Sequence, residues 1–234
     1  MRGGIKKNWW KFLGILFVMY ALIGGLLLEV PRLDILNETI RNLFYHVTMW
    51  FGMMILMTVS AIYSIKYLRG YALKNDDVAN NAAQIGLLLG TLGISTGSVW
   101  ARFTWGTFWV SDPKLNGAAI TLLIYLAYMV LRNSMDEEQK RAKIAAVYNI
   151  FAFVMLVVFL GILPRTTDSL HPGNGGNPGF SAYEEDLDSS MRLVFYPAII
   201  GWTLLGVWML QLRLRMKRIK DTLEETDSVS KHLV

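Results

Sequence analysis

Six stretches of this chain are rich in apolar side chains and contain no aspartate, glutamate, lysine or arginine. They cover residues 12–28, 43–65, 82–101, 117–131, 144–163 and 193–212. Most of them match the roughly 20 residues that an apolar helix needs to cross the hydrocarbon core of a bilayer. The fourth stretch is shorter, so we expect its outer end either to begin within the connection before it or to lie below the membrane surface. The sequence therefore predicts an all-α fold, a polytopic membrane bundle of six transmembrane helices.

The basic residues predict how this bundle is oriented. Lysine and arginine number 17 in the N-terminal segment, the second and fourth connections and the C-terminal tail, against 6 in the other three connections. Positively charged segments stay on the cytoplasmic side, so both termini are expected inside the cell. In this arrangement residues 1–212 form the six-span domain and 213–234 a basic cytoplasmic tail. The outer connections then include an aromatic loop at 102–116 and a long loop at 164–190.

The composition limits the classes of partner and chemistry. The net charge of +5 comes from basic residues that cluster beside the predicted spans, where anionic membrane lipid attracts them. Membrane lipid is therefore an expected partner and nucleic acid is not. The sequence contains no cysteine, which excludes disulfides, thiolate metal sites and thiol redox chemistry from it.

Two of the three histidines, His46 and His171, are predicted to lie on the same outer face although 125 residues separate them. The third, His232, is in the inner tail with no informative neighbours. A histidine near a span usually faces a polar cavity or a partner, and a lone one is more often a hydrogen-bonding residue than a ligand. Iron porphyrin takes imidazole from both sides of its plane. The pair therefore predicts non-covalent heme b, with both imidazoles as axial ligands of the iron.

An aromatic loop lies between the two histidines in the sequence. Trp105 and Trp109 are four residues apart, so we expect them to share a helical face and offer two ring planes to a flat ligand. Any one tryptophan, however, is commonly an interfacial belt residue. Asp112 before Pro113 is typical of a helix start, a role favoured over a catalytic one.

Two further patterns leave alternatives open. The cations near this loop, Arg102 and Lys114, could pair with ligand carboxylates or anchor the membrane interface. Four glycines of the third stretch recur at intervals of 4, 3 and 4 and form one helical stripe: Gly86, Gly90, Gly93 and Gly97. Tight helix packing is the favoured interpretation of this stripe, and room for the edge of a ligand is the alternative.

The segment Trp105-Gly106-Thr107-Phe108-Trp109-Val110-Ser111-Asp112-Pro113-Lys114-Leu115 resembles a known tryptophan-rich signature. It is the signature of the heme-handling proteins of c-type cytochrome biogenesis, the CcmC/CcsA family, and runs Trp-Gly-x-x-Trp-x-Trp-Asp-x-Arg-Leu. Six spans and one outer histidine on each side of the signature also match, and the chain's size resembles the CcmC branch. Ser111 stands where the family usually has tryptophan, and Lys114 where it has arginine, which replaces a planar fork by a point charge.

This resemblance implies a function at the periplasmic face of the bacterial inner membrane. It implies that His46 and His171 hold heme, with Trp105, Gly106, Trp109 and Asp112 in the loop beside the porphyrin. It further implies delivery to a periplasmic heme chaperone of the CcmE type, which captures heme covalently through its own histidine. An ABC-type heme exporter and a small membrane subunit are the other implied partners. The chain would then be no enzyme, but a protein that presents heme in a fixed orientation and could assist its covalent attachment to the chaperone.

Three alternatives belong to other classes. The first is a permease for heme or a lipid-like substrate; the six apolar cores lack the ionisable residues of ion-coupled transporters, which disfavours coupling but not an uncoupled conduit. The second is a heme-binding subunit of a respiratory complex, although both histidines are predicted at the rim and not within the bilayer. The third is a membrane scaffold without a ligand.

Overall fold

The computed structural model describes residues 2–32, 36–171 and 187–232, and within these ranges it contains helices and no strand. The elements in chain order are α1 (Arg2–Leu27), η1 (Glu38–Phe44), α2 (His46–Gly70), α3 (Leu73–Trp105), α4 (Pro113–Asn133), α5 (Glu138–Leu156), η2 (Val157–Ile162), α6 (Leu163–Thr166) and α7 (Ser189–His232). Six helical segments of this part of the chain are long and apolar enough to cross a membrane. The prediction of an all-α fold with six spans is confirmed.

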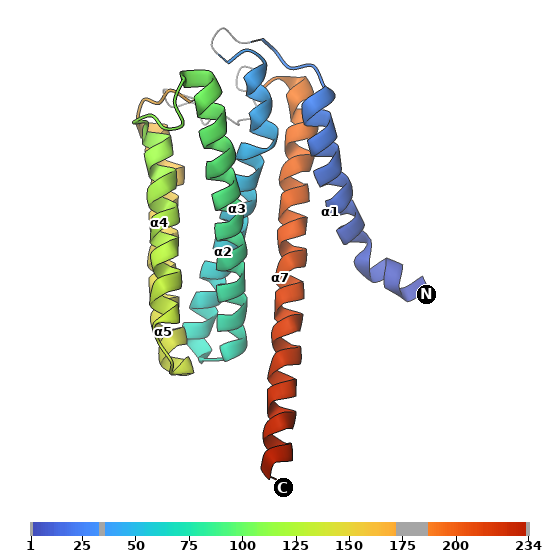
Figure 1. Ribbon diagram of the computed structural model, residues 1–234, viewed down its shortest axis with the longest axis vertical. Coiled ribbons are helices and arrows are strands. Elements are labelled where there is room, and N and C mark those ends of the chain that lie inside the picture. Colours follow the sequence, from blue (N-terminus) through green and yellow to red (C-terminus); the bar gives the residue numbers. More distant parts are fainter. Residues whose placement is uncertain (1, 33–35, 172–186, 233–234) are drawn as a thin grey trace.

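The helices run side by side in one bundle. Helices α2, α3, α4 and α5 form one group, and α1 packs against α7 beside it, with α7 also touching α2 and α3 (Figure 1). The start of α1 and the end of α7 lie toward the same end of the bundle (Figure 1). We call the opposite end, where α3 ends and α4 begins, the pocket end.

The glycine stripe of α3 lies against α2. A Cβ atom added at Gly86 would come within 2.9 Å of Met57 Cε, and one at Gly93 within 2.9 Å of Trp50 Nε1. At Gly97 an added Cβ would overlap the imidazole of His46. Small residues thus let α2 and α3 approach closely, which confirms the packing interpretation of the stripe.

The aromatic segment between α3 and α4 is not helical. Helix α3 ends at Trp105 because Gly106 adopts a left-handed conformation with φ of +80°, a region that L side chains rarely enter. Helix α4 begins at Pro113, capped by the Asp112 carboxylate as the sequence predicted. The prediction that Trp105 and Trp109 share a helical face is wrong, because the helix ends between them.

A second irregularity lies at the pocket end of the fifth span. Pro164 has no N–H to donate to the carbonyl of Leu160, and its ring would crowd that carbonyl in a regular α-helix. Helix α5 accordingly widens into the π-helical segment η2 before the single turn of α6. Most of the long loop predicted at 164–190 lies outside the described residues.

A buried ion pair lies toward the opposite end of the bundle. The Arg132 guanidinium of α4 donates to both carboxylate oxygens of Asp76 on α3, at 2.7 and 2.5 Å. Their side chains are 7% and 5% exposed. The pair therefore links α3 to α4 at positions that are far in the sequence from the connection between the two helices.

Candidate functional site

A cavity of about 450 Å³ opens at the pocket end of the bundle. This volume is within the range of pockets that hold small molecules and cofactors. Its walls come from η1, α2, α3, α4, η2 and α6, together with Trp109 and His171. Most of the wall is apolar, and its members include Val47, Phe51, Met54, Leu115 and Leu160.

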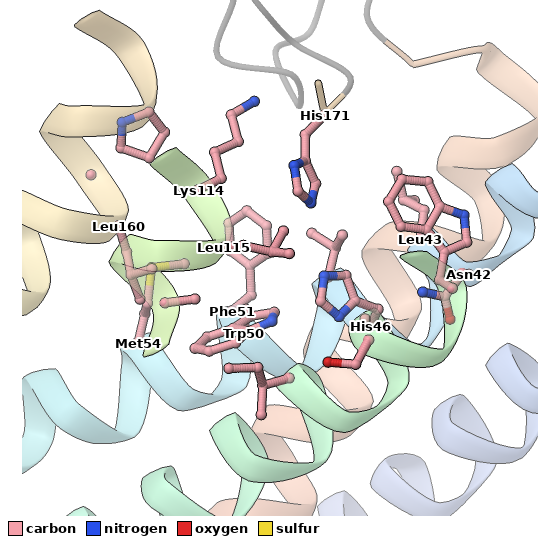
Figure 2. Close-up of a pocket in the computed structure, with 18 of the residues that line it drawn as sticks. Asn42, Leu43, His46, Trp50, Phe51, Met54, Lys114, Leu115, Leu160 and His171 are labelled. Atoms are coloured by element: carbon pink, nitrogen blue, oxygen red, sulfur yellow. The ribbon is translucent and has the colours of Figure 1, made fainter. Parts of the chain in front are cut away.

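His46 and His171 line this same cavity, from elements remote in the chain. In Figure 2 the ring of His171 projects into the pocket from above, and His46 lies below it with Trp50 and Phe51. His46 is the first residue of α2, and His171 follows α6. The fold therefore brings together the two imidazoles that the sequence singled out.

The ring of His46 is held in one orientation by the backbone of α3. Its Nδ1 lies 2.6 Å from the carbonyl oxygen of Gly93. A carbonyl can only accept a hydrogen bond, so Nδ1 carries a proton, and in the neutral ring Nε2 keeps its lone pair. Gly97 leaves the space that the ring occupies. This is the state in which an imidazole can coordinate a metal.

His171 is held in the same tautomer by a carboxylate. Its Nδ1 lies 3.1 Å from Oδ1 of Asp112, whose side chain is 1% exposed. An ionised carboxylate accepts and does not donate, so Nδ1 carries the proton here too. A carboxylate behind the imidazole is the usual second partner of a metal-binding histidine. In the neutral form of each ring, Nε2 is therefore the nitrogen that carries the lone pair.

Asp112 connects the two elements that flank the cavity. It caps α4 through the backbone N–H of Lys114, and its other oxygen accepts from Ser169 Oγ at 2.8 Å and Leu170 N at 2.7 Å. Burial opposes its ionisation, but the hydrogen bonds from His171, Leu170 and Ser169 hold the pKa of this carboxyl below its usual range. Asp112 thus positions His171 and does not itself line the cavity.

The tryptophans occupy two different places. Trp105 contacts the His171 ring edge-on, with ring centroids 4.9 Å apart, and is not part of the cavity lining. Trp109 and Trp100 line the cavity, and Trp109 Nε1 donates to Asn116 at 3.3 Å. Trp105 therefore supports an imidazole, whereas the other two offer ring surface to a ligand.

Of the remaining predicted site residues, one lines the cavity and two lie outside its lining. Lys114 lines the cavity from the first turn of α4. Arg102 instead donates to the carbonyl of Gly106, and its guanidinium carbon lies 5.9 Å from the Phe108 ring centroid. Neither Arg102 nor Gly106 belongs to the lining that the described residues form.

Sequence reasoning did not assign five contributors to this site: Gly93, Gly97, Trp100, Ser169 and Arg165. The glycine stripe, together with a histidine at the end of the neighbouring span, was the available signal for the first two. No local pattern marks Ser169, since its role depends on the fold of the chain around Asp112. Arg165 is a single charge after Pro164 and becomes notable only because the fold places it on the cavity.

The donor set suits a metal that arrives with most of its own ligands. Among the described residues there is no group of three or more histidine, cysteine, aspartate or glutamate side chains able to hold a bare ion. Two imidazoles in an apolar pocket fit the two axial positions of an iron macrocycle, which supplies the equatorial nitrogens itself. The chemistry of the cavity therefore fits heme.

Comparison with known proteins gives a consistent result. The family model described as heme exporter protein C, CcmC, matches residues 4–229. A cytochrome c biogenesis protein CcsA of Prochlorococcus marinus is 30% identical over 169 residues, covering 68% of this chain and 52% of that protein. A heme exporter protein C of Bradyrhizobium diazoefficiens is 28% identical over 174 residues, covering 73% of this chain and 64% of that protein. The matches thus span about half to two thirds of the length of these relatives.

Proposed function

Because this multi-pass membrane protein belongs to the heme exporter protein C family, we propose that it binds heme non-covalently in the cavity and presents it for c-type cytochrome maturation. One observation carries the proposal: two imidazoles, each with Nδ1 engaged by the protein, project into one apolar cavity. A relative with the same family description and others described as cytochrome c biogenesis proteins support it.

In this proposal heme is the cargo, and the chain's own residues hold and orient it. His46 and His171 bind the iron through Nε2, because the Gly93 carbonyl and Asp112 hold the proton of each neutral ring on Nδ1. Trp100 and Trp109 cover part of the macrocycle. The apolar wall excludes water from the rings, which favours binding of a hydrophobic plate. The role proposed for this chain is therefore delivery of heme.

The proposed location follows from the charge distribution and the family. The basic segments lie at the end of the bundle opposite the cavity, and such segments stay in the cytoplasm. The cavity then opens at the periplasmic face of a bacterial inner membrane. There a periplasmic heme chaperone of the CcmE type would take the heme, with ABC-type exporter subunits and a small membrane subunit as further partners.

The direct test is the heme content of the purified protein. Wild type, His46→Ala and His171→Ala are purified in detergent with their endogenous ligand, and heme is measured by its absorption and by extraction. His232→Ala, which removes the third histidine, is the matched control. We expect heme in wild type and in the control, and reduced heme with an altered Soret band in each of the other variants. A wild-type protein that neither carries nor takes up heme contradicts the proposal.

A further inference from the structure

We propose that Lys114 and Arg165 form a two-cation anchor that binds both carboxylates of the porphyrin and so fixes which edge of the macrocycle faces which wall. This inference rests on the proposed function, and it assigns a binding role to Arg165.

The wall of the cavity carries positive charge. Besides the two histidines, the lining formed by the described residues contains two cationic side chains and no carboxylate. Asp112, which precedes α4, is not part of this lining, and its oxygens accept hydrogen bonds from His171, Ser169 and Leu170. A wall with two positive charges and no negative one attracts a dianionic ligand.

Both cations lie on the same side of the cavity. Lys114 is in the first turn of α4, and Arg165 is in α6, directly after the π-helical segment η2. Helix α4 and η2 are in close contact, since a Cβ added at Gly117 would lie 2.8 Å from the carbonyl oxygen of Phe159. Arg165 also donates to the carbonyl of Gly161, a residue of the same wall.

The opposite side of the cavity differs in charge. Figure 2 shows Lys114 and Leu160 on one side of the pocket and Asn42 and Leu43 on the other. The cation closest in sequence to that second side, Arg41, is outside the lining and donates to the backbone carbonyls of Gly25 and Leu28. The described part of that wall is thus neutral.

This asymmetry orients the ligand. The carboxylates of heme are on one edge, and charge-assisted hydrogen bonds draw that edge toward α4 and α6. The opposite edge of the macrocycle, which carries no charge, then faces η1, where Asn42 and Leu43 lie. A single orientation is what delivery to a partner requires, because only one edge can be offered in a fixed place.

The test compares two ligands that differ only in charge, heme and heme dimethyl ester. Affinities for both are measured by Soret titration in wild type, Lys114→Gln, Arg165→Gln, Arg165→Lys and the double glutamine variant. Arg32→Gln is the matched control, because Arg32 is a largely exposed arginine that pairs with Glu38 in the segment between α1 and α2. Partitioning of the ester into detergent is the same for every variant and cancels when the heme-to-ester affinity ratios are compared.

We expect each glutamine substitution to lower the heme-to-ester ratio roughly three- to tenfold, the scale of a partly exposed charge-assisted pair. The double variant should lower the ratio further, and Arg165→Lys and Arg32→Gln should stay close to wild type. Ester affinity and the imidazole signature of the spectrum should remain unchanged. A ratio unaffected by Arg165→Gln in a protein that binds heme through both histidines overturns the anchor alone. A wild type that binds neither ligand overturns the proposed function beneath it.

Discussion

At the scale of single residues, the site is defined by what lies behind each imidazole. His46 donates to a backbone carbonyl, and His171 donates to a buried carboxylate. The two are therefore not equivalent: a side-chain substitution can remove the partner of His171 but not that of His46. The residue-scale predictions accordingly concern Asp112.

Replacing Asp112 with alanine should weaken heme binding without removing either ligand. The substitution frees the His171 ring, and loss of such a second partner typically lowers metal affinity roughly 10- to 100-fold. It also removes the cap of α4, which costs roughly 1 kcal/mol of stability. Asp112→Asn, which keeps an acceptor oxygen, should lie between alanine and wild type. Heme titration followed at the Soret band measures the order; equal affinity of Asp112→Ala and wild type would show that His171 needs no such partner.

Asp112 also predicts a pH dependence of stability. Its pKa is lower in the folded protein than the ordinary value of about 3.9, so its ionised form stabilises the fold. This contribution is fully present above the ordinary value and is lost as the pH falls through the depressed one. The difference in thermal stability between wild type and Asp112→Asn should therefore be constant from about pH 7 to 5 and shrink below about pH 4. A difference that already disappears between pH 7 and 5 contradicts an ionised, hydrogen-bonded Asp112.

At the scale of elements, the contact between α2 and α3 determines where His46 can lie. The periodicity of the four glycines predicted this close contact, because spacing along a helix is visible in the sequence. The sequence did not show that the stripe ends against the His46 ring, since that depends on the register of α2 against α3. The same limit explains Trp105 and Trp109: their spacing suited a helix, but the left-handed Gly106 ends the helix between them.

The helix contact yields a prediction at Gly97. Gly97→Ala would place a Cβ atom 2.8 Å from Nδ1 of His46 and so displace the ring from the Gly93 carbonyl. We expect the variant to fold and to lose the His46 contribution to the heme spectrum. Gly86→Ala is the control, because its Cβ would meet only the flexible end of Met57. Equal spectra for the two alanine variants would contradict the role of Gly97.

At the scale of the whole molecule, the apolar pattern was enough to predict the class of fold. Six charge-free stretches specify six spans because a bilayer penalises any other arrangement of such segments. Less of the pocket could be predicted from the sequence. Its second cation, Arg165, reaches the wall through the π-helical segment before Pro164, and an isolated arginine in a long connection gives no signal of that.

The orientation across the membrane can be tested in intact cells, because the sequence contains no cysteine of its own. Leu170→Cys lies at the pocket end and is exposed, and Ser134→Cys lies at the opposite end, between α4 and α5. A membrane-impermeant maleimide should label the first variant in intact cells and the second only after the membrane is opened. The reverse pattern would place the cavity in the cytoplasm and contradict periplasmic delivery.

The proposed binding of heme requires one coordination state, a single iron held by His46 and His171 together. Electron paramagnetic resonance of the ferric, heme-loaded protein measures this directly. We predict a low-spin bis-imidazole signal in wild type, and its replacement by a high-spin or otherwise altered signal in both His46→Ala and His171→Ala. An unchanged bis-imidazole signal in either variant would contradict the central claim.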